Sequence, residues 1–166
     1  MGVSAFTREF DRIPNRLTLD SKIIYSGNTI DAKCLWDTGA TCTAISNEVV
    51  ARLNLVPISK MTIHTPSESK DSNVYLVDIA LPNNVVVQDV QVCDSEIGTQ
   101  GIDLLIGMNI ISRGDFAVTT SNGKTSFTFR MPSDGRIDFV KNIGLMNTLA
   151  KKRVPKTEYP KTETIV

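Results

Sequence analysis

Apolar and polar residues alternate in short runs along most of this chain, which is the pattern of strands that bury one face. Turn-forming residues separate the runs, as at Ser26-Gly27-Asn28 and at Asn122-Gly123. The strands that this pattern predicts are 17–25, 29–36, 58–64, 74–81, 85–93, 103–106, 115–120 and 125–130. Many short strands at close spacing predict an all-β fold, a small closed β-barrel.

Helical signals in the same stretch are brief. Ser46 is a good N-cap and predicts a short helix over 47–53, which Pro57 prevents from continuing. One further helical turn is expected at 108–112. The barrel therefore carries one or two short helices.

The two ends of the chain have a different character. Residues 1–15 are mixed and polar, so we expect a loosely held N-terminal arm before a barrel domain at 16–131. The apolar residues of 132–150 lie at a spacing that allows an amphipathic helix in this C-terminal extension. Residues 151–166 are rich in Lys, Thr and Pro and predict a disordered tail.

Composition narrows the class of protein. The chain has 166 residues, 41% of them hydrophobic, and a formal net charge of +0, which suits one soluble domain. Balanced charge and the lack of a long apolar run predict neither a nucleic-acid partner nor a membrane partner. Three cysteines without zinc-type spacing predict reduced thiols and a cytoplasmic location. The single histidine, His64, predicts no metal site.

The run Asp37-Thr38-Gly39-Ala40 follows the apolar residues of strand 29–36 and is the strongest chemical signal. It places one carboxylate at the end of a buried strand, next to a hydroxyl and a glycine that lets backbones approach closely. Hydrolysis by acid–base catalysis needs one group that accepts a proton and another that donates one. Because Asp-Thr-Gly occurs once in the sequence, the second carboxylate has to come from another copy. The motif thus predicts a homodimer with a shared active site.

Two more segments are candidates for the same site. Leu105, Ile106 and Gly107 end an apolar strand, and they would pack beneath the Asp37 loop and hold it rigid. The long hairpin 58–81 would form a flap over a bound peptide. Each of the three elements also has an ordinary structural explanation, namely a capped turn, a core strand and an exposed hairpin.

Taken together, these motifs resemble those of retropepsins, the homodimeric aspartic proteases of retroviral type. The runs 32–41 and 103–111 look most like retropepsin-like proteins of bacteria and their mobile elements. The resemblance covers about residues 17 to 131 and implies the single-lobe acid-protease barrel, a polypeptide substrate and no cofactor.

The resemblance also implies roles for particular residues. Asp37 would be the catalytic residue, one from each subunit, supported by Thr38, Gly39 and Ala40. Leu105, Ile106 and Gly107 would be the structural second motif. The flap residues that would contact substrate are Thr62, Ile63, His64, Thr65 and Pro66.

The sequence departs from viral retropepsins at several positions. The acidic residue after the motif is replaced by the uncharged Thr41, Cys42 and Thr43, and its arginine partner by Met108, so their ion pair is absent. Asn109 stands where related cellular sequences often have Asp. The C-terminal strand of the dimer interface is not obvious, and 127–131 or 137–140 are the two candidates.

The leading hypothesis is therefore a homodimeric aspartic endopeptidase that activates water with a pair of Asp37 carboxylates. The alternative is a non-catalytic dimerisation and peptide-binding module on the same fold, since fold does not guarantee chemistry. A third hypothesis is a zymogen in which 1–15 or the tail covers the cleft until self-cleavage.

Overall fold

The computed structural model describes residues 2–64 and 69–153. It divides into two compact units, Met1–Asp134 and Gly135–Val166. The first unit contains every strand in the described part of the chain, and the second contains one helix.

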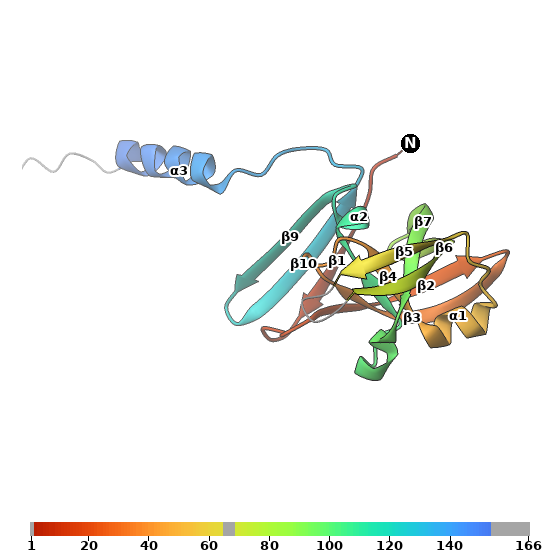
Figure 1. The fold of residues 1–166 in the computed structure, drawn as a ribbon. Coiled ribbons are helices and arrows are strands. Elements are labelled where there is room, and N and C mark those ends of the chain that lie inside the picture. Colours follow the sequence, from red (N-terminus) through yellow and green to blue (C-terminus); the bar gives the residue numbers. More distant parts are fainter. Residues whose placement is uncertain (1, 65–68, 154–166) are drawn as a thin grey trace, which may run out of the picture. The chain divides into compact units, whose positions relative to one another are not determined.

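Most strands of the first unit form one curved sheet (Figure 1). Its members are β2 (Leu17–Tyr25), β3 (Asn28–Trp36), β4 (Thr43–Ser46), β5 (Ser59–His64), β6 (Ser69–Leu81), β7 (Val85–Ser95) and β8 (Leu104–Ile106). The strand order is β2-β3-β8-β4-β7-β6-β5, and β2 also pairs with β6. This extra pairing closes six of the described strands into a barrel and leaves β5 outside the ring, joined to β6. The predicted all-β barrel is confirmed.

The hairpin turns follow the sequence signals. Ser26 and Gly27 join β2 to β3 with positive φ angles of 48° and 80°. Asn122 and Gly123 do the same in the last hairpin, at 52° and 76°. Positive φ at both central positions is the geometry whose twist matches that of the flanking strands.

A second sheet has the order β1-β10-β9, formed by β1 (Ser4–Phe10), β9 (Asp115–Ser121) and β10 (Lys124–Met131). The expectation that 1–15 is a loosely held arm is therefore wrong for Ser4–Phe10, which pairs along β10 from Ser4↔Met131 to Phe10↔Thr125. The physical reason is Phe6, which is only 4% exposed and anchors this strand in the core.

The two candidate interface strands are also placed differently from what the sequence indicated. Residues 127–131 belong to β10, whose two edges are already paired with β1 and β9 of the same chain. Residues 137–140 form no strand, because the helix of the second unit begins at Phe139. Neither segment offers a free strand edge for another copy.

The helices are short except for the last. Helix α1 (Asn47–Leu53) begins as predicted, with the Val49 N–H donating to Ser46 Oγ at 3.3 Å. Helix α2 (Met108–Ile111) follows Gly107, and a 3-10 helix, η1 (Glu96–Gln100), was not predicted. Helix α3 (Phe139–Arg153) forms the second unit, and it includes the first three residues of the predicted tail. Residues 154–166 of that tail lie outside the described residues.

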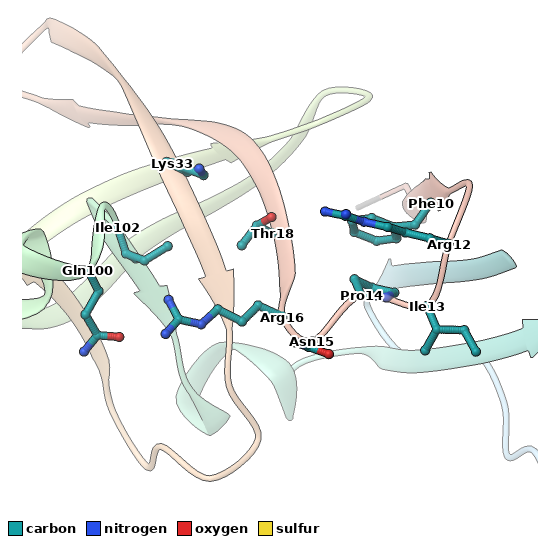
Figure 2. A pocket seen from close by; sticks show the side chains of 10 residues that line it. All are labelled: Phe10, Arg12, Ile13, Pro14, Asn15, Arg16, Thr18, Lys33, Gln100 and Ile102. Atoms are coloured by element: carbon teal, nitrogen blue, oxygen red, sulfur yellow. The ribbon is translucent and has the colours of Figure 1, made fainter. Parts of the chain in front are cut away.

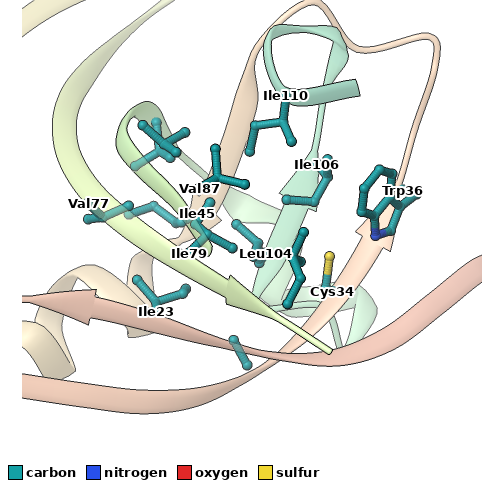
Figure 3. Packing of buried hydrophobic residues seen from close by; sticks show 14 of the residues in the cluster. Ile23, Cys34, Trp36, Ile45, Val77, Ile79, Val87, Leu104, Ile106 and Ile110 are labelled. Atoms are coloured by element: carbon teal, nitrogen blue, oxygen red, sulfur yellow. The ribbon is translucent and has the colours of Figure 1, made fainter. Parts of the chain in front are cut away.

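The main core fills the barrel (Figure 3) and also includes Phe6, Phe127 and Phe129 of the second sheet. Cys34 and Trp36 of β3 point into it, as do Leu104 and Ile106 of the neighbouring β8. Trp36 contacts the aromatic rings of Phe6, Phe116, Phe127 and Phe129, with centroid distances between 4.9 and 5.8 Å. This aromatic cluster, Trp36 with the four phenylalanines, attaches the second sheet to the barrel.

A smaller apolar cluster lies on the other side of β3 and β8. Its buried members are Ala44, Cys93, Ile97 and Ile102, and Leu35, Cys42, Met61 and Leu105 pack against them. We refer to these eight residues as the cleft cluster. Because side chains alternate along a strand, Leu35 and Leu105 necessarily face away from the main core.

Candidate active site

Asp37 lies at the point where two parallel strands end. Strands β3 and β8 pair in parallel with Trp36 opposite Ile106, and the Asp37 N–H extends this ladder by donating to Ile106 O at 3.0 Å. The side chain of Asp37 is partly buried, whereas Thr38 and Gly39 at the loop tip are exposed. The core below therefore fixes the base of the loop, and its tip faces outward.

The turn after Asp37 orients its carboxylate. Gly39 N–H donates to Asp37 Oδ1 at 2.8 Å, and Ala40 N–H donates to Asp37 O at 3.3 Å. A β-carbon at Gly39 would lie 3.1 Å from the same Oδ1 atom and would crowd it. Glycine thus avoids a tight contact with the carboxylate that its N–H binds.

The second motif supports the loop from beneath. Met108 N–H donates to Ala40 O at 2.8 Å, and Asn109 N–H donates to Thr41 O at 3.1 Å. A β-carbon on Gly107 would lie 2.9 Å from Ala40 O and closer still to Cys42 O. Gly107 therefore lets the start of α2 pack directly against the backbone that follows Asp37.

Thr43 and Asn109 form a polar bridge that the sequence analysis did not identify. Thr43 Oγ1 donates to Asn109 Oδ1 at 2.7 Å and accepts from Gly107 N–H at 3.2 Å. Asn109 Nδ2 in turn donates to Gln91 O of β7 at 3.2 Å. A polar Thr immediately before the apolar pair Ala44-Ile45 was the available signal. In this neutral bridge, the uncharged Thr43 and Asn109 connect the two motifs.

A cavity of about 500 Å³ opens beside the loop. Its lining comes from the Asp37 loop (Gly39, Ala40), from β8 (Leu105), from β5 (Met61, Thr62) and from β7 (Cys93). The structure thus brings part of each of the three predicted elements around one space. Ile106 instead points into the main core, and Gly107 lies under the loop.

The flap residues predicted from sequence are only partly described. Thr62 lines the cavity, and its hydroxyl donates to Asp71 Oδ1 of β6 at 3.0 Å. The backbones of Ile63 and His64 pair with Lys70 and Ser69 in the hairpin. Thr65 and Pro66 lie outside the described residues.

Asp94 stabilises the base of this hairpin and was also missed. It accepts hydrogen bonds from the hydroxyl of Ser72, from the backbone and side chain of Asn73 at 2.9 Å, and from Tyr75 Oη at 3.2 Å. Burial raises the pKa of Asp94, but these donors outweigh it and leave the pKa below its usual value. Asp94 is therefore a structural carboxylate that joins β6 to β7.

The cysteines near the cavity are free thiols. Burial, with a smaller effect of the neighbouring Cys42, raises the pKa of Cys93 to about 11. Burial also raises the pKa of Cys34. A thiol that stays protonated is a poor nucleophile, so Cys93 and Cys34 are packing residues here.

No group of three or more His, Cys, Asp or Glu side chains in residues 2–64 and 69–153 could hold a metal ion. Within the same described residues, no helix has the length and hydropathy to cross a bilayer.

A family model described as "Aspartyl protease" matches residues 23–110, which is more than half of the chain and includes both motifs. The chain belongs to this aspartyl protease family, and its resemblance to the retropepsin-like members is confirmed. A search of curated proteins found no match.

Solved structures with a similar fold include a retropepsin-like aspartic protease from Rickettsia conorii. That match has a TM-score of 0.53 and 14% identity, and covers 78% of this chain and 96% of that one. The solution structure of a simian foamy virus protease matches with a TM-score of 0.42 and 24% identity, over 58% of this chain and 92% of that one. At such identity the Rickettsia match shows the shared fold.

Proposed function

We propose that the protein is a homodimeric aspartic endopeptidase whose active site pairs Asp37 of one copy with Asp37 of another. The observation that carries this proposal is the Asp37 loop itself. One carboxylate is oriented by the Gly39 N–H, is supported from below by the second motif, and lies beside a cavity that the flap hairpin also lines.

The dimer follows from the chemistry of hydrolysis. Water must lose a proton as it attacks the peptide carbonyl, and the carbonyl oxygen must gain one. Two close carboxylates that share one proton perform both tasks, because they cannot both be ionised. Each chain supplies one such carboxylate, since Asp-Thr-Gly occurs once.

In this scheme one Asp37 carboxylate takes the proton from water, and the other donates its proton to the carbonyl oxygen. The tetrahedral intermediate then collapses as the proton passes to the leaving amine. Thr38, which is exposed at the loop tip, would contact the loop of the second copy. An extended substrate would lie between the loop and β5, where Met61 and Thr62 face the cavity.

The experiment compares wild type with Asp37→Asn on an unfolded protein mixture between pH 4 and 7, with the oligomeric state followed by sedimentation. We expect wild type to cleave and Asp37→Asn to lose about 10³-fold or more of that activity, because the amide cannot accept the proton of water. Asp31→Asn is the matched control, since the Asp31 side chain is 87% exposed and forms a surface ion pair with Lys22.

Equal inactivity of wild type and Asp37→Asn, with both proteins dimeric, would instead favour the non-catalytic dimerisation and peptide-binding module. Cleavage by a protein that stays monomeric at all concentrations would refute the paired site.

A further inference from the structure

A second cavity, of about 490 Å³, lies away from the Asp37 loop on the same unit. It forms where the connection between β1 and β2 passes β3, the end of η1 and the segment after it (Figure 2). The residues that matter for its chemistry are Phe10, Arg12, Arg16, Lys33, Gln100 and Ile102.

The lining of this cavity is cationic. Arg12, Arg16 and Lys33 contribute to it, and no carboxylate does. Within the part of the chain that the structure describes, none of these three cations belongs to an ion pair, whereas Lys22, Lys70, Lys124 and Arg130 each do. Figure 2 shows Arg16 extending toward Gln100 and Ile102.

Two carboxylates approach this cavity from its edges. Asp20 lies opposite Lys33 in the β2–β3 register, and Asp103 Oδ2 accepts the backbone N–H of Lys33 at 2.8 Å. They offset part of the charge near Lys33. Arg12 and Arg16 remain as the two guanidinium groups, which present planar donors suited to a carboxylate.

The strand β3 relates this cavity to the proposed catalytic residue. Lys33, Leu35 and Asp37 alternate to the same face, so Lys33 is about 13 Å from Asp37 along the chain at about 3.3 Å per residue. Leu35 and Ile102 belong to the cleft cluster, which also lines the cavity beside Asp37. An extended peptide advances by a similar distance per residue. A substrate held at Asp37 would therefore reach the cationic cavity with a residue about four positions from the scissile bond.

We propose that this cavity is a subsite for an acidic side chain of the polypeptide substrate, a few residues from the bond that is cut. The carboxylate would bind to Arg16, with Gln100 as a further polar contact, and Arg12, which lies beside Phe10, would add positive charge on the other side of the cavity. This inference rests on the proposed function and extends it by naming the substrate class.

The first test measures binding without cleavage. A fluorescent ten-residue peptide of alternating Glu and Gly is titrated with full-length Asp37→Asn protein in low salt, beside the same peptide with Gln for Glu. We expect the Glu peptide to bind about tenfold more tightly. Adding Arg12→Gln and Arg16→Gln should remove most of that difference.

The matched control adds Arg52→Gln and Lys141→Gln instead, which lowers the net charge equally at two exposed positions that do not line this cavity. If the control variant still binds the Glu peptide more tightly than the Gln peptide, the proposal is supported. If the control loses this preference as fully as the Arg12/Arg16 variant does, or if the Arg12/Arg16 variant keeps it in full, the proposal is overturned. Tighter binding of a mixed-sequence oligonucleotide than of the Glu peptide would overturn the assignment to a polypeptide.

The second test maps the bonds that wild type cuts in an unfolded protein mixture. We expect Glu and Asp to be enriched about four positions from the cut, and this enrichment to disappear in the Arg12→Gln/Arg16→Gln variant while cleavage at other sites continues. Glu-dependent binding without such enrichment would overturn the role as a substrate subsite. If wild type cleaves no bond at all, the proposed protease function is refuted. The binding result would still stand, because the binding test uses a variant that does not need to cleave.

Discussion

On one face of β3, Cys34 and Trp36 lie in a closed core, whereas on the other face Leu35 packs against the smaller cleft cluster and Asp37 is only partly buried. The closed face is packed by the aromatic cluster, whose members come from both sheets. The open face has only the cleft cluster, with partly exposed members. The difference indicates that the two faces of β3 have different roles. Tight packing on the closed face fixes the strand, and this fixed strand holds the Asp37 carboxylate in one direction.

The largest expected effect comes from removing a side chain on the closed face. Trp36→Ala should lower the free energy of unfolding by about 3–5 kcal/mol, because it leaves a cavity among four aromatic rings. Urea denaturation measures this loss. The matched change is Leu35→Ala on the open face, for which we expect about 1–2 kcal/mol, since Leu35 is only partly buried. Equal losses for the two neighbours would remove the contrast between the faces.

Gly107 packs against the backbone of the loop that carries Asp37, and its substitution should rank second. In Gly107→Ala the new methyl group would press on the backbone oxygens of Ala40 and Cys42. We expect a loss of about 1–3 kcal/mol and a displaced Asp37 loop, so cleavage should fall more than stability alone explains. Gly144→Ala is the control, because nothing lies within 4 Å of a β-carbon there. A Gly107→Ala enzyme with full activity would contradict the supporting role of the second motif.

The Thr43–Asn109 bridge should have a smaller effect. Thr43→Val removes the hydroxyl and leaves the Gly107 N–H and Asn109 Oδ1 without this partner, at a cost of about 1–2 kcal/mol. Thr43→Ser keeps the hydroxyl and should recover most of the loss. Thermal unfolding of the three proteins measures both changes. If Thr43→Val and Thr43→Ser have the same Tm, the Thr43 hydroxyl does not stabilise the loop.

The smallest effect is a pH dependence at the end of the second sheet. Hydrogen bonds from Ser133 and the Asp134 N–H, together with Arg130, lower the pKa of Asp115 from 3.8 to about 2. A lowered pKa stabilises the fold above the unfolded value of 3.8, and this contribution is lost as pH falls toward 2. The difference in Tm between wild type and Asp115→Asn should therefore shrink between pH 4 and pH 2. A constant difference across that range would contradict the assignment.

The sequence predicted well those features that local patterns determine. The alternation of apolar and polar residues predicted the strands. Asn122-Gly123 predicted a hairpin turn, and Ser46 predicted the start of α1. The opposite orientation of Trp36 and Asp37 also followed from alternation alone. The two motifs, 37–40 and 105–107, could be expected to lie side by side because their order and separation resemble those of retropepsins.

Features that depend on contacts distant in sequence were missed. Strand β1 forms because Phe6 packs with rings more than a hundred residues away, and its own sequence is too polar to indicate this. The Thr43–Asn109 bridge spans 66 positions, and the Asp94 network spans about 20. The cationic cavity likewise combines a connection, a strand and a segment after η1, none of which has a charged motif.

The pairing of β1 with β10 has a consequence for assembly. The second sheet is formed entirely by strands of one chain, so no strand of another copy is needed to complete it. Under the proposed mechanism, dilution would lower Tm only by the stability that association adds, whereas turnover per chain would drop as copies separate. Diluting the protein could thus switch the activity off while leaving every subunit intact and ready to recombine.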